Sequence, residues 1–181
     1  MYSAHDRAHS FKFSRAHRNR MAVPQGNNAD EILPGLWLGN FNASRDDVFL
    51  KTHQIETVFN CTKDLPFNPI IQNRYRVPVD DNLQPDEIRN MELWSFEIIY
   101  KLIRERKKEK PILVHCAAGM QRSAAVVAMY LITTENMTWD QARRHIKQRR
   151  PIAFYPSANF EKAIVGFYNS FQRDIRPNLE A

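Results

Sequence analysis

The stretch His115-Cys116-Ala117-Ala118-Gly119-Met120-Gln121-Arg122-Ser123 lies between two apolar segments. The segment before it, Ile112-Leu113-Val114, has the length of a buried strand, and the segment from Ala124 to Ile132 is apolar nearly all round. The sequence therefore predicts a buried strand, a tight loop and a buried helix, in that order. We call residues 115–123 the signature loop; a cysteine stands near its start and an arginine near its end.

The signature loop has the composition of an anion-binding site built around a thiol. Backbone N–H groups at the start of a helix are unpaired, and the helix dipole favours an anion there. Gly119 lets the backbone curl so that successive N–H groups converge, and the guanidinium of Arg122 can hold two phosphate oxygens. The same field lowers the pKa of a cysteine thiol from about 8.5 to roughly 3.5–7.5. We therefore predict that Cys116 is a nucleophile that attacks phosphate.

Two further residues of the loop are expected to support this chemistry. Ser123 can donate a hydrogen bond to the sulfur of Cys116 and ease its departure in a second step. His115 is expected to hydrogen-bond the loop backbone from behind. The alternative is an inert cysteine at the end of a core strand, which is the commoner situation for a single cysteine. The Cys-x5-Arg-Ser spacing with an internal glycine argues against that alternative.

The stretch HCAAGMQRS resembles the signature loop of the cysteine-dependent protein tyrosine phosphatases and, more narrowly, of the dual-specificity phosphatases. Other stretches are similar to further parts of that family. EILPGLWLGNFNAS resembles its opening strand pair and first helix, IETVFNCTKD its next core strand, YRVPVDDN its general-acid segment and PSANFEKAI its closing helix. The resemblance covers residues 30–172.

The resemblance implies an α/β fold with a central, mostly parallel sheet of about five strands flanked by helices. The apolar runs themselves predict strands near residues 32, 37, 57, 76 and 113. The signature loop then lies at the carboxyl end of a central strand, where open α/β sheets bind ligands. The residues expected to bind the phosphate are Ala117, Ala118, Gly119, Met120, Gln121 and Arg122. Gln121 replaces the small residue common in dual-specificity loops, so we expect it to narrow the cleft rim or to contact the substrate.

Asp80 and Asp81 follow a predicted strand at Tyr75–Val79. A carboxyl group there can protonate the leaving oxygen and then accept a proton from water. The resemblance to the family's acid segment assigns this role to Asp81 and makes Asp80 its neighbour. Two alternatives stay open: Asp80 is the acid, or both residues only cap the helix that begins near Pro85.

The remaining apolar patterns predict helices and their caps. Asn42 or Ser44 is expected to cap a helix that runs to about His53. A long amphipathic helix is expected from Ile88 to Lys107, and Thr138 begins a capping box for a helix that reaches Arg149. Ser157 is expected to cap a closing helix, Ala158–Gln172, whose core face consists of Phe160, Ile164, Phe167 and Phe171.

The 181 residues suffice for one domain, and a hydrophobic fraction of 43% suffices for a sizeable core. We expect a basic, flexible arm at 1–29, a catalytic domain at 30–172 and a C-terminal tail at 173–181. The arm is interpreted as a solvated tail or as a docking arm for an acidic partner or nucleic acid. An oligomerisation arm or a targeting peptide is also open.

The chain has no apolar run of about eighteen residues and no apolar signal-peptide core at its start, so we expect no membrane span and an intracellular, cytoplasmic or nuclear location. Its two cysteines do not make a disulfide scaffold. Cys61 lies at or just past the end of the predicted strand Ile55–Asn60. In the fold that the resemblance implies, this strand should neighbour the strand leading to Cys116. We therefore interpret Cys61 as a redox partner of Cys116 or as an inert core residue.

The predicted function is hydrolysis of phosphotyrosine and phosphoserine or phosphothreonine in proteins through a phosphocysteine intermediate, with no cofactor and no metal. RNA 5′-phosphatases and phosphoinositide phosphatases use the same loop chemistry and are the second hypothesis. Their loops often carry His or Lys, whereas Ala117, Ala118 and Met120 are uncharged. A phosphate-binding scaffold without turnover is the third hypothesis. The net charge of +6 favours anionic partners but does not choose among them.

Overall fold

The computed structural model describes residues 26–179, so nearly all of the predicted basic arm lies outside the described residues. Its centre is a five-stranded sheet in the order β1-β2-β5-β3-β4. The pair β1–β2 is antiparallel, and the pairs β2–β5, β5–β3 and β3–β4 are parallel. The strands are β1 (Ala29–Leu33), β2 (Leu36–Gly39), β3 (Thr57–Asn60), β4 (Asn73–Arg76) and β5 (Ile112–His115). The predicted α/β fold with a mostly parallel sheet is confirmed.

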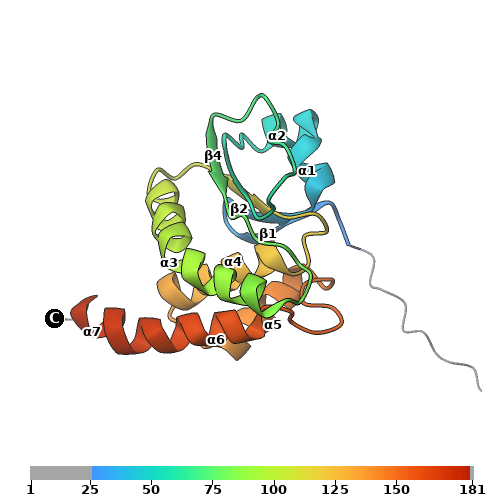
Figure 1. Cartoon of the computed structure of the whole chain (residues 1–181). Helices are drawn as coiled ribbons and strands as arrows, with labels where there is room; N and C mark the ends of the chain where they lie inside the picture. The colour runs from blue at the N-terminus through green and yellow to red at the C-terminus, as the bar shows by residue number, and fades with distance from the viewer. Residues whose placement is uncertain (1–25, 180–181) are drawn as a thin grey trace, which may run out of the picture.

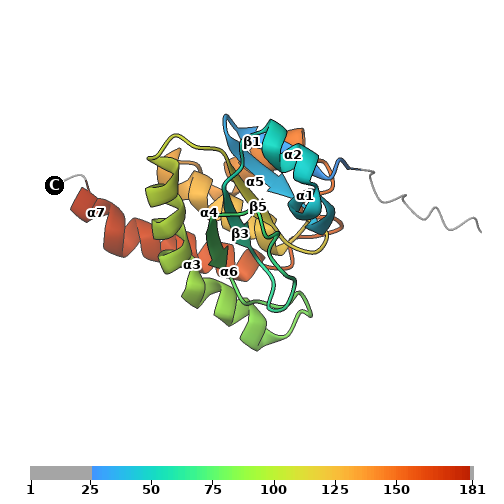
Figure 2. The ribbon, with the colours of Figure 1, turned by 90° about the horizontal axis from the view of Figure 1, so that it is seen from above.

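Helices cover both faces of the sheet (Figures 1 and 2). The short helices α1 (Phe41–Arg45) and α2 (Asp47–Thr52) lie on one face, where Leu50 packs with Val58 and Leu113. The longer helices cover the other face and form the larger core cluster. These are α3 (Pro85–Arg106), α4 (Arg122–Thr134), α5 (Trp139–Arg149) and α6 (Glu161–Ser170).

The central strand β5 explains why the sequence before the signature loop is so apolar. All four of its residues are buried, because helices cover the sheet on both sides. Gly39, Asn60 and His115 pair in one register, so β2, β3 and β5 end at the same edge of the sheet. The signature loop leaves β5 at this carboxyl edge and leads directly into α4, which is buried over most of its length.

Two helix predictions are wrong in detail. The helix expected to reach His53 is divided into α1 and α2, because Asp46 adopts an extended conformation between them and its carboxylate accepts the N–H of Phe49. Asn40 caps α1, not Asn42 or Ser44. The closing helix begins at Glu161, and Ser157 does not cap it. The Ser157 carbonyl instead accepts a hydrogen bond from Gln121 of the signature loop, so this segment supports the loop.

Other local predictions are confirmed. Thr138 and Gln141 form the predicted capping box at the start of α5. The predicted core face of the closing helix is buried at Phe160, Ile164, Phe167 and Phe171. The C-terminal residues differ from a simple tail, because a π-helical turn (Phe171–Ile175) and α7 (Arg176–Leu179) continue the helical path past residue 173. No helix among residues 26–179 has the length and apolarity needed to cross a membrane.

Candidate active site

The Cys116 thiol lies at the start of the signature loop and is surrounded by donors. The Ser123 hydroxyl donates to its Sγ at 3.2 Å, and the Gly119 N–H donates at 3.3 Å. Burial alone raises the thiol pKa, but the hydroxyl and N–H of Ser123, the charge of Arg122 and the Gly119 N–H together bring the pKa of Cys116 below its ordinary value. The loop therefore favours the thiolate, the form that acts as a nucleophile.

Four consecutive carbonyl groups of the loop are engaged on its outer side. The Ala117 oxygen accepts the N–H of Phe41 at 3.1 Å, and the Met120 oxygen accepts the N–H of Phe154 at 2.8 Å. The oxygens of Ala118 and Gly119 accept hydrogen bonds from Arg150, at 3.4 and 2.7 Å. Because a trans peptide directs its C=O and its N–H to opposite sides, N–H groups 118 to 121 are directed inward. This arrangement is a cradle of backbone donors beside the sulfur.

Gly119 is the residue whose conformation this cradle requires. Its φ of +66° lies in the left-handed region, which side chains disfavour. A Cβ atom added to Gly119 would lie 2.5 Å from the backbone oxygen of Gly39. The loop thus packs directly against the end of β2, and no other residue type fits there without a shift of backbone.

Arg122 begins α4 and closes the cradle. One of its terminal nitrogens, Nη1, donates to the Val79 carbonyl at 3.2 Å. Its Nε is buried without a hydrogen-bond partner among the described residues. A buried donor without a partner is costly, and such groups are usually explained by a ligand or water. The guanidinium is thus anchored at one nitrogen and keeps donor capacity for an anion.

The two acidic residues after Val79 have different partners. The Asp80 carboxylate pairs with Lys63 at 2.9 Å, and its N–H donates to Glu87. The Asp81 carboxylate is exposed and accepts the Asn159 side-chain amide at 2.8 Å. Neither carboxylate caps α3, whose N-cap residue Gln84 makes no side-chain cap bond. The alternative in which both acids merely cap this helix is therefore wrong.

Known proteins resemble this chain over most of its length. The sequence model of the family "Dual specificity phosphatase, catalytic domain" matches residues 36–170. The chain belongs to this family. It is 29% identical over 157 residues to the tyrosine-protein phosphatase vhp-1 of Caenorhabditis elegans. It is also 29% identical over 155 residues to dual specificity protein phosphatase 22-B of Danio rerio.

The extent of these similarities differs between the relatives. The match to vhp-1 covers 85% of this chain but 23% of that protein, so the chain spans less than two thirds of its length. The match to the Danio rerio protein covers 86% of this chain and 82% of that one. The crystal structure of human DUSP28 superposes with a TM-score of 0.72 at 23% identity, over 83% of this chain and 99% of that chain. Its likeness supports the dual-specificity phosphatase fold.

His115 lies beneath the loop of this dual-specificity phosphatase domain. Its side chain is fully buried, and Nδ1 lies 3.4 Å from the Cys116 carbonyl oxygen. Nε2 is buried with no hydrogen-bond partner among residues 26–179. Burial lowers the pKa of His115 to about 4, and the charges of Arg76 and Arg122 act in the same direction. The imidazole is therefore neutral near pH 7 and adds no positive charge beneath the thiolate.

Gln121 has a different position from the one expected at the cleft rim. Its side-chain amide donates to the carbonyls of Tyr155 and Ser157, at 3.0 and 2.8 Å, and accepts the N–H of Asn159 at 3.0 Å. All of these partners lie in the loop before α6. The Gln121 side chain thus joins the signature loop to that segment, and only its backbone remains available for a bound anion.

Cys61 is the next residue after β3 and lies beside the signature loop. Its N–H donates to the His115 carbonyl at 2.7 Å, so the two cysteines follow paired residues of neighbouring strands. Both thiols are free and buried. Burial raises the pKa of the Cys61 thiol, and negative charge on Cys116 raises it further. The surroundings therefore favour the thiol form at Cys61 and move the pKa of the neighbouring Cys116 in the opposite direction.

Sequence reasoning missed two residues that hold this site together. Arg150 is fully buried and contacts the signature loop, although it belongs to a run of cations that predicts a solvated surface. Asn159 joins Asp81 to Gln121 through its side chain and its backbone. The neighbouring sequence does not indicate that either residue contacts the site, because each contact joins segments far apart in the sequence. Pro151 marks only the end of the helix that precedes Arg150.

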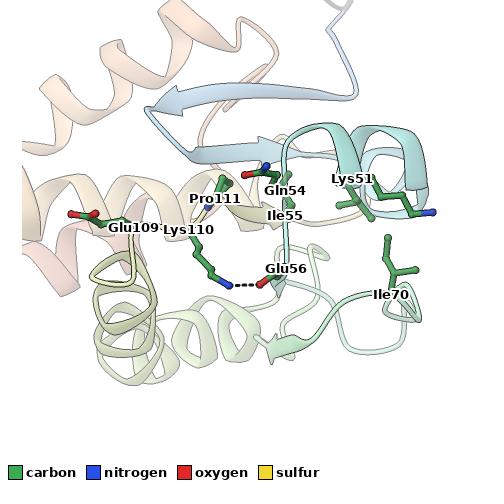
Figure 3. A pocket seen from close by; sticks show the side chains of 9 residues that line it. Lys51, Gln54, Ile55, Glu56, Ile70, Glu109, Lys110 and Pro111 are labelled. Carbon is green, nitrogen blue, oxygen red and sulfur yellow. Dashed lines mark hydrogen bonds and ion pairs between the residues drawn. The ribbon is translucent and has the colours of Figure 1, made fainter.

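A hollow of about 480 Å³ lies at the opposite edge of the sheet (Figure 3). It adjoins the amino ends of β3 and β5, where Glu56 and Lys110 form an ion pair of 2.7 Å. The signature loop follows the carboxyl end of β5, so this hollow is separate from the site around Cys116. Its lining residues are Leu50, Lys51, Gln54, Ile55, Glu56, Ile70, Glu109, Lys110 and Pro111.

Proposed function

We propose that this chain is a cysteine-dependent phosphatase that hydrolyses phosphotyrosine and phosphoserine or phosphothreonine in proteins. The observation that carries the proposal is the signature loop, in which outward-facing carbonyls leave N–H groups directed towards a thiol of lowered pKa. A ring of backbone donors fits the non-bridging oxygens of a phosphoryl group, and a thiolate beside it is placed to attack phosphorus. Membership of the dual-specificity phosphatase family supports the same activity.

In the first proposed step, the Cys116 thiolate attacks phosphorus and an S–P bond forms while the bond to the leaving oxygen breaks. Arg122 and the loop N–H groups hold the three non-bridging oxygens as their charge is redistributed. Asp81 donates a proton to the leaving oxygen, which departs as an alcohol or phenol. The anchoring of Arg122 to the Val79 carbonyl supports this geometry, because Asp81 is only two residues beyond Val79.

In the second proposed step, water attacks the phosphocysteine. Asp81, now a carboxylate, accepts a proton from the water, and the S–P bond breaks to release inorganic phosphate and the thiolate. The Ser123 hydroxyl, 3.2 Å from Sγ, stabilises the departing sulfur. We prefer Asp81 to Asp80 as the acid because Asp80 is engaged by Lys63, whereas the partner of Asp81 is a neutral amide.

The residues at the rim of the cradle support phosphorylated proteins as the substrates. Ala117 and Ala118 are exposed and small, so a phosphorylated side chain meets no bulky wall on that side. Neither they nor Met120 adds a cation to the loop, which gives little help to a highly charged RNA 5′-triphosphate or phosphoinositide. A thiolate nucleophile also requires reducing conditions, so we propose an intracellular, cytoplasmic or nuclear location.

One assay panel tests this function. The wild-type protein is offered a phosphotyrosine peptide, a phosphothreonine peptide, an RNA 5′-triphosphate and a phosphoinositide, and released phosphate is measured. We expect turnover of both peptides to exceed that of the other two substrates. Faster hydrolysis of the RNA or the lipid would assign the chain to that alternative class.

The matched control is Cys116→Ser, which leaves the backbone cradle in place. We expect it to abolish turnover while it still binds a phosphotyrosine peptide, as measured by calorimetry. Residual activity within about tenfold of wild type, or about 1.4 kcal/mol in activation free energy, would remove Cys116 from the nucleophile role. Absence of turnover in the wild-type protein on all four substrates would instead favour a phosphate-binding scaffold.

A further inference from the structure

Arg150 is a charged side chain buried behind the signature loop. It follows α5 directly, and its side chain is 0% exposed. Its Nη1 pairs with the Asp30 carboxylate of β1 at 2.6 Å and donates to the Asn27 carbonyl at 2.9 Å. Its other nitrogens donate to the loop, from Nε to the Gly119 oxygen and from Nη2 to the Ala118 oxygen. One guanidinium therefore joins β1 and the segment before it to two successive peptide groups of the loop.

These two peptide groups carry N–H donors of the cradle. The first contains the Ala118 carbonyl and the Gly119 N–H, and this N–H donates to the sulfur of Cys116 at 3.3 Å. The second contains the Gly119 carbonyl and the Met120 N–H. Since each peptide group is planar and trans, a donor that holds the oxygen outward keeps the N–H directed inward. A cation on the oxygen also polarises the amide and makes its N–H a stronger donor.

The packing around Gly119 shows that Arg150 is in direct contact with the loop. A Cβ atom added to Gly119 would lie 2.7 Å from Arg150 Nη2, so the guanidinium fills the space behind the glycine. The planar fork supplies Nε and Nη2 to adjacent carbonyls while Nη1 remains for Asp30 and Asn27. A lysine at this position would supply a single ammonium group, which cannot span all of these partners.

A purely structural role does not explain this choice of residue. Burying an ion pair costs desolvation free energy, and well-packed apolar residues at such places are often equally or more stabilising. A leucine or methionine could fill the end of α5, but only a cationic fork can orient two neighbouring peptide groups. The hydrogen bonds from Arg150 to the loop carbonyls therefore explain the choice of arginine better than its ion pair with Asp30 does.

We propose that Arg150 is a positioning residue that orients the Gly119 and Met120 N–H groups towards the thiolate and the phosphoryl oxygens. Asp30 and the Asn27 carbonyl hold Arg150 in turn, so β1 and the residues before it contribute to the active site from a distance. This inference rests on the proposed phosphatase function, because it concerns the same loop. It adds that activity also depends on Arg150, whose guanidinium acts through the loop backbone and not by direct contact with the sulfur.

Two variants and one control test the proposal. Arg150→Lys keeps the charge but loses the fork, and the double variant Asp30→Leu with Arg150→Met removes both buried charges together. Arg149→Met is the control, because this neighbouring cation is exposed and its side chain hydrogen-bonds to His145 rather than to the signature loop. For each protein we measure the pH dependence of Cys116 alkylation by iodoacetamide, with mass spectrometry to locate the modified cysteine. We also measure kcat and KM on an aryl phosphate, and the melting temperature.

We expect both Arg150 variants to move the alkylation midpoint of Cys116 upward by about one pH unit, the value of a lost hydrogen bond to a charged group. We expect kcat/KM to fall by about 10²-fold, as for a misplacement of about 1 Å in a catalytic site. Arg149→Met should stay within about twofold of wild type, as surface substitutions usually do. The readout that a merely structural role would leave unchanged is the alkylation midpoint.

A folded Arg150 variant whose alkylation profile and kcat/KM match those of Arg149→Met would overturn the proposal. Failure of both Arg150 variants to fold would assign the residue to the stability of the domain and would also overturn it. The alkylation profile reports on the loop without turnover. It therefore separates this inference from the proposed function, which is tested by the release of phosphate from the four substrates by the wild-type protein.

Discussion

The signature loop and the acid segment, residues 79–84, lie at the same edge of the sheet but are held in different ways. Carbonyls 117 to 120 of the loop each have a donor, and Cys116, Gly119 and Ser123 are buried. In the acid segment, residues 81–84 are exposed, and Asp81 is held by one side-chain amide. Exposed polar contacts contribute little stability, whereas several buried hydrogen bonds to successive carbonyls hold a loop more rigidly.

This difference matches the roles that we propose for the two regions. A cradle for a transferred phosphoryl group works best when its donors are fixed before the substrate arrives. A general acid has to reach leaving oxygens on side chains of different length, and an exposed segment can adjust to them. Two adjacent residues connect the regions: Arg122 donates to the Val79 carbonyl, and Gln121 accepts the N–H of Asn159, which holds Asp81. Rigidity is therefore concentrated in the region proposed to hold the negative charge of the phosphoryl group.

After the loss of the nucleophile in Cys116→Ser, the largest effect is expected from a change at Arg122, within the rigid region. Arg122→Lys keeps a positive charge but cannot hold two oxygens in one plane. We expect kcat/KM to fall by about 10²–10³-fold, comparable to the removal of one transition-state donor. Steady-state kinetics on a phosphotyrosine peptide measure this loss. If the lysine variant retained most of its activity, a point charge would suffice and the loop geometry would matter less than we argue.

A change in the acid segment should have an effect that depends on the substrate. Asp81→Asn removes the proposed proton donor, so we expect a fall of about 10²-fold in kcat on peptide substrates. The fall should be clearly smaller on an activated aryl phosphate, whose leaving group needs no proton. Asp80→Asn is the matched control and should be milder on both substrates. The reverse order of the two variants would assign the acid to Asp80.

Acid should lower the free energy of unfolding of the protein through the titration of His115, which lies in the buried region. The pKa of this residue is about 4 in the folded chain and about 6.5 when unfolded, so the unfolded state binds the proton more readily. The protonation of His115 therefore does not reduce the free energy of unfolding above about pH 6.5. It reduces this free energy increasingly as the pH falls towards 4, by about 3 kcal/mol at pH 4. Urea unfolding of wild type and His115→Gln at pH 7 and pH 4 measures this difference. Equal losses in the two proteins would show that His115 is not the group responsible.

The smallest effect is expected at Cys61, which we propose as a redox partner of Cys116. Peroxide converts the Cys116 thiolate to a sulfenic acid, and the neighbouring Cys61 thiol can condense with it to give a disulfide and water. Cys61→Ser should therefore leave turnover nearly unchanged but reduce the activity recovered by a thiol reductant after peroxide treatment. Equal recovery in both proteins, with no Cys61–Cys116 bridge in the mass spectrum, would make Cys61 an inert core residue.

The sequence by itself determined the fold class and the location of the candidate site. The apolar run at Ile112–Val114, the glycine-containing loop and the apolar run from Ala124 act over short distances, because strand, loop and helix are consecutive. Burial from both sides makes a central strand uniformly apolar, so its position could be read from composition alone. Cys116, Gly119 and Ser123 meet because they belong to one turn of chain, and their spacing could be recognised without any distant contact.

The tertiary structure alone decided the partners that lie far away in the chain. Arg150 is separated by 31 residues from Gly119 and by 120 from Asp30, and Asn159 by 78 from Asp81. A run of cations at the end of a helix predicts a solvated surface, and nothing local distinguishes the one that is buried. Gln121 likewise turns to the segment before α6, which the sequence could not indicate. The physical reason is that burial and hydrogen-bond partners depend on which elements pack together, whereas spacing within a loop does not.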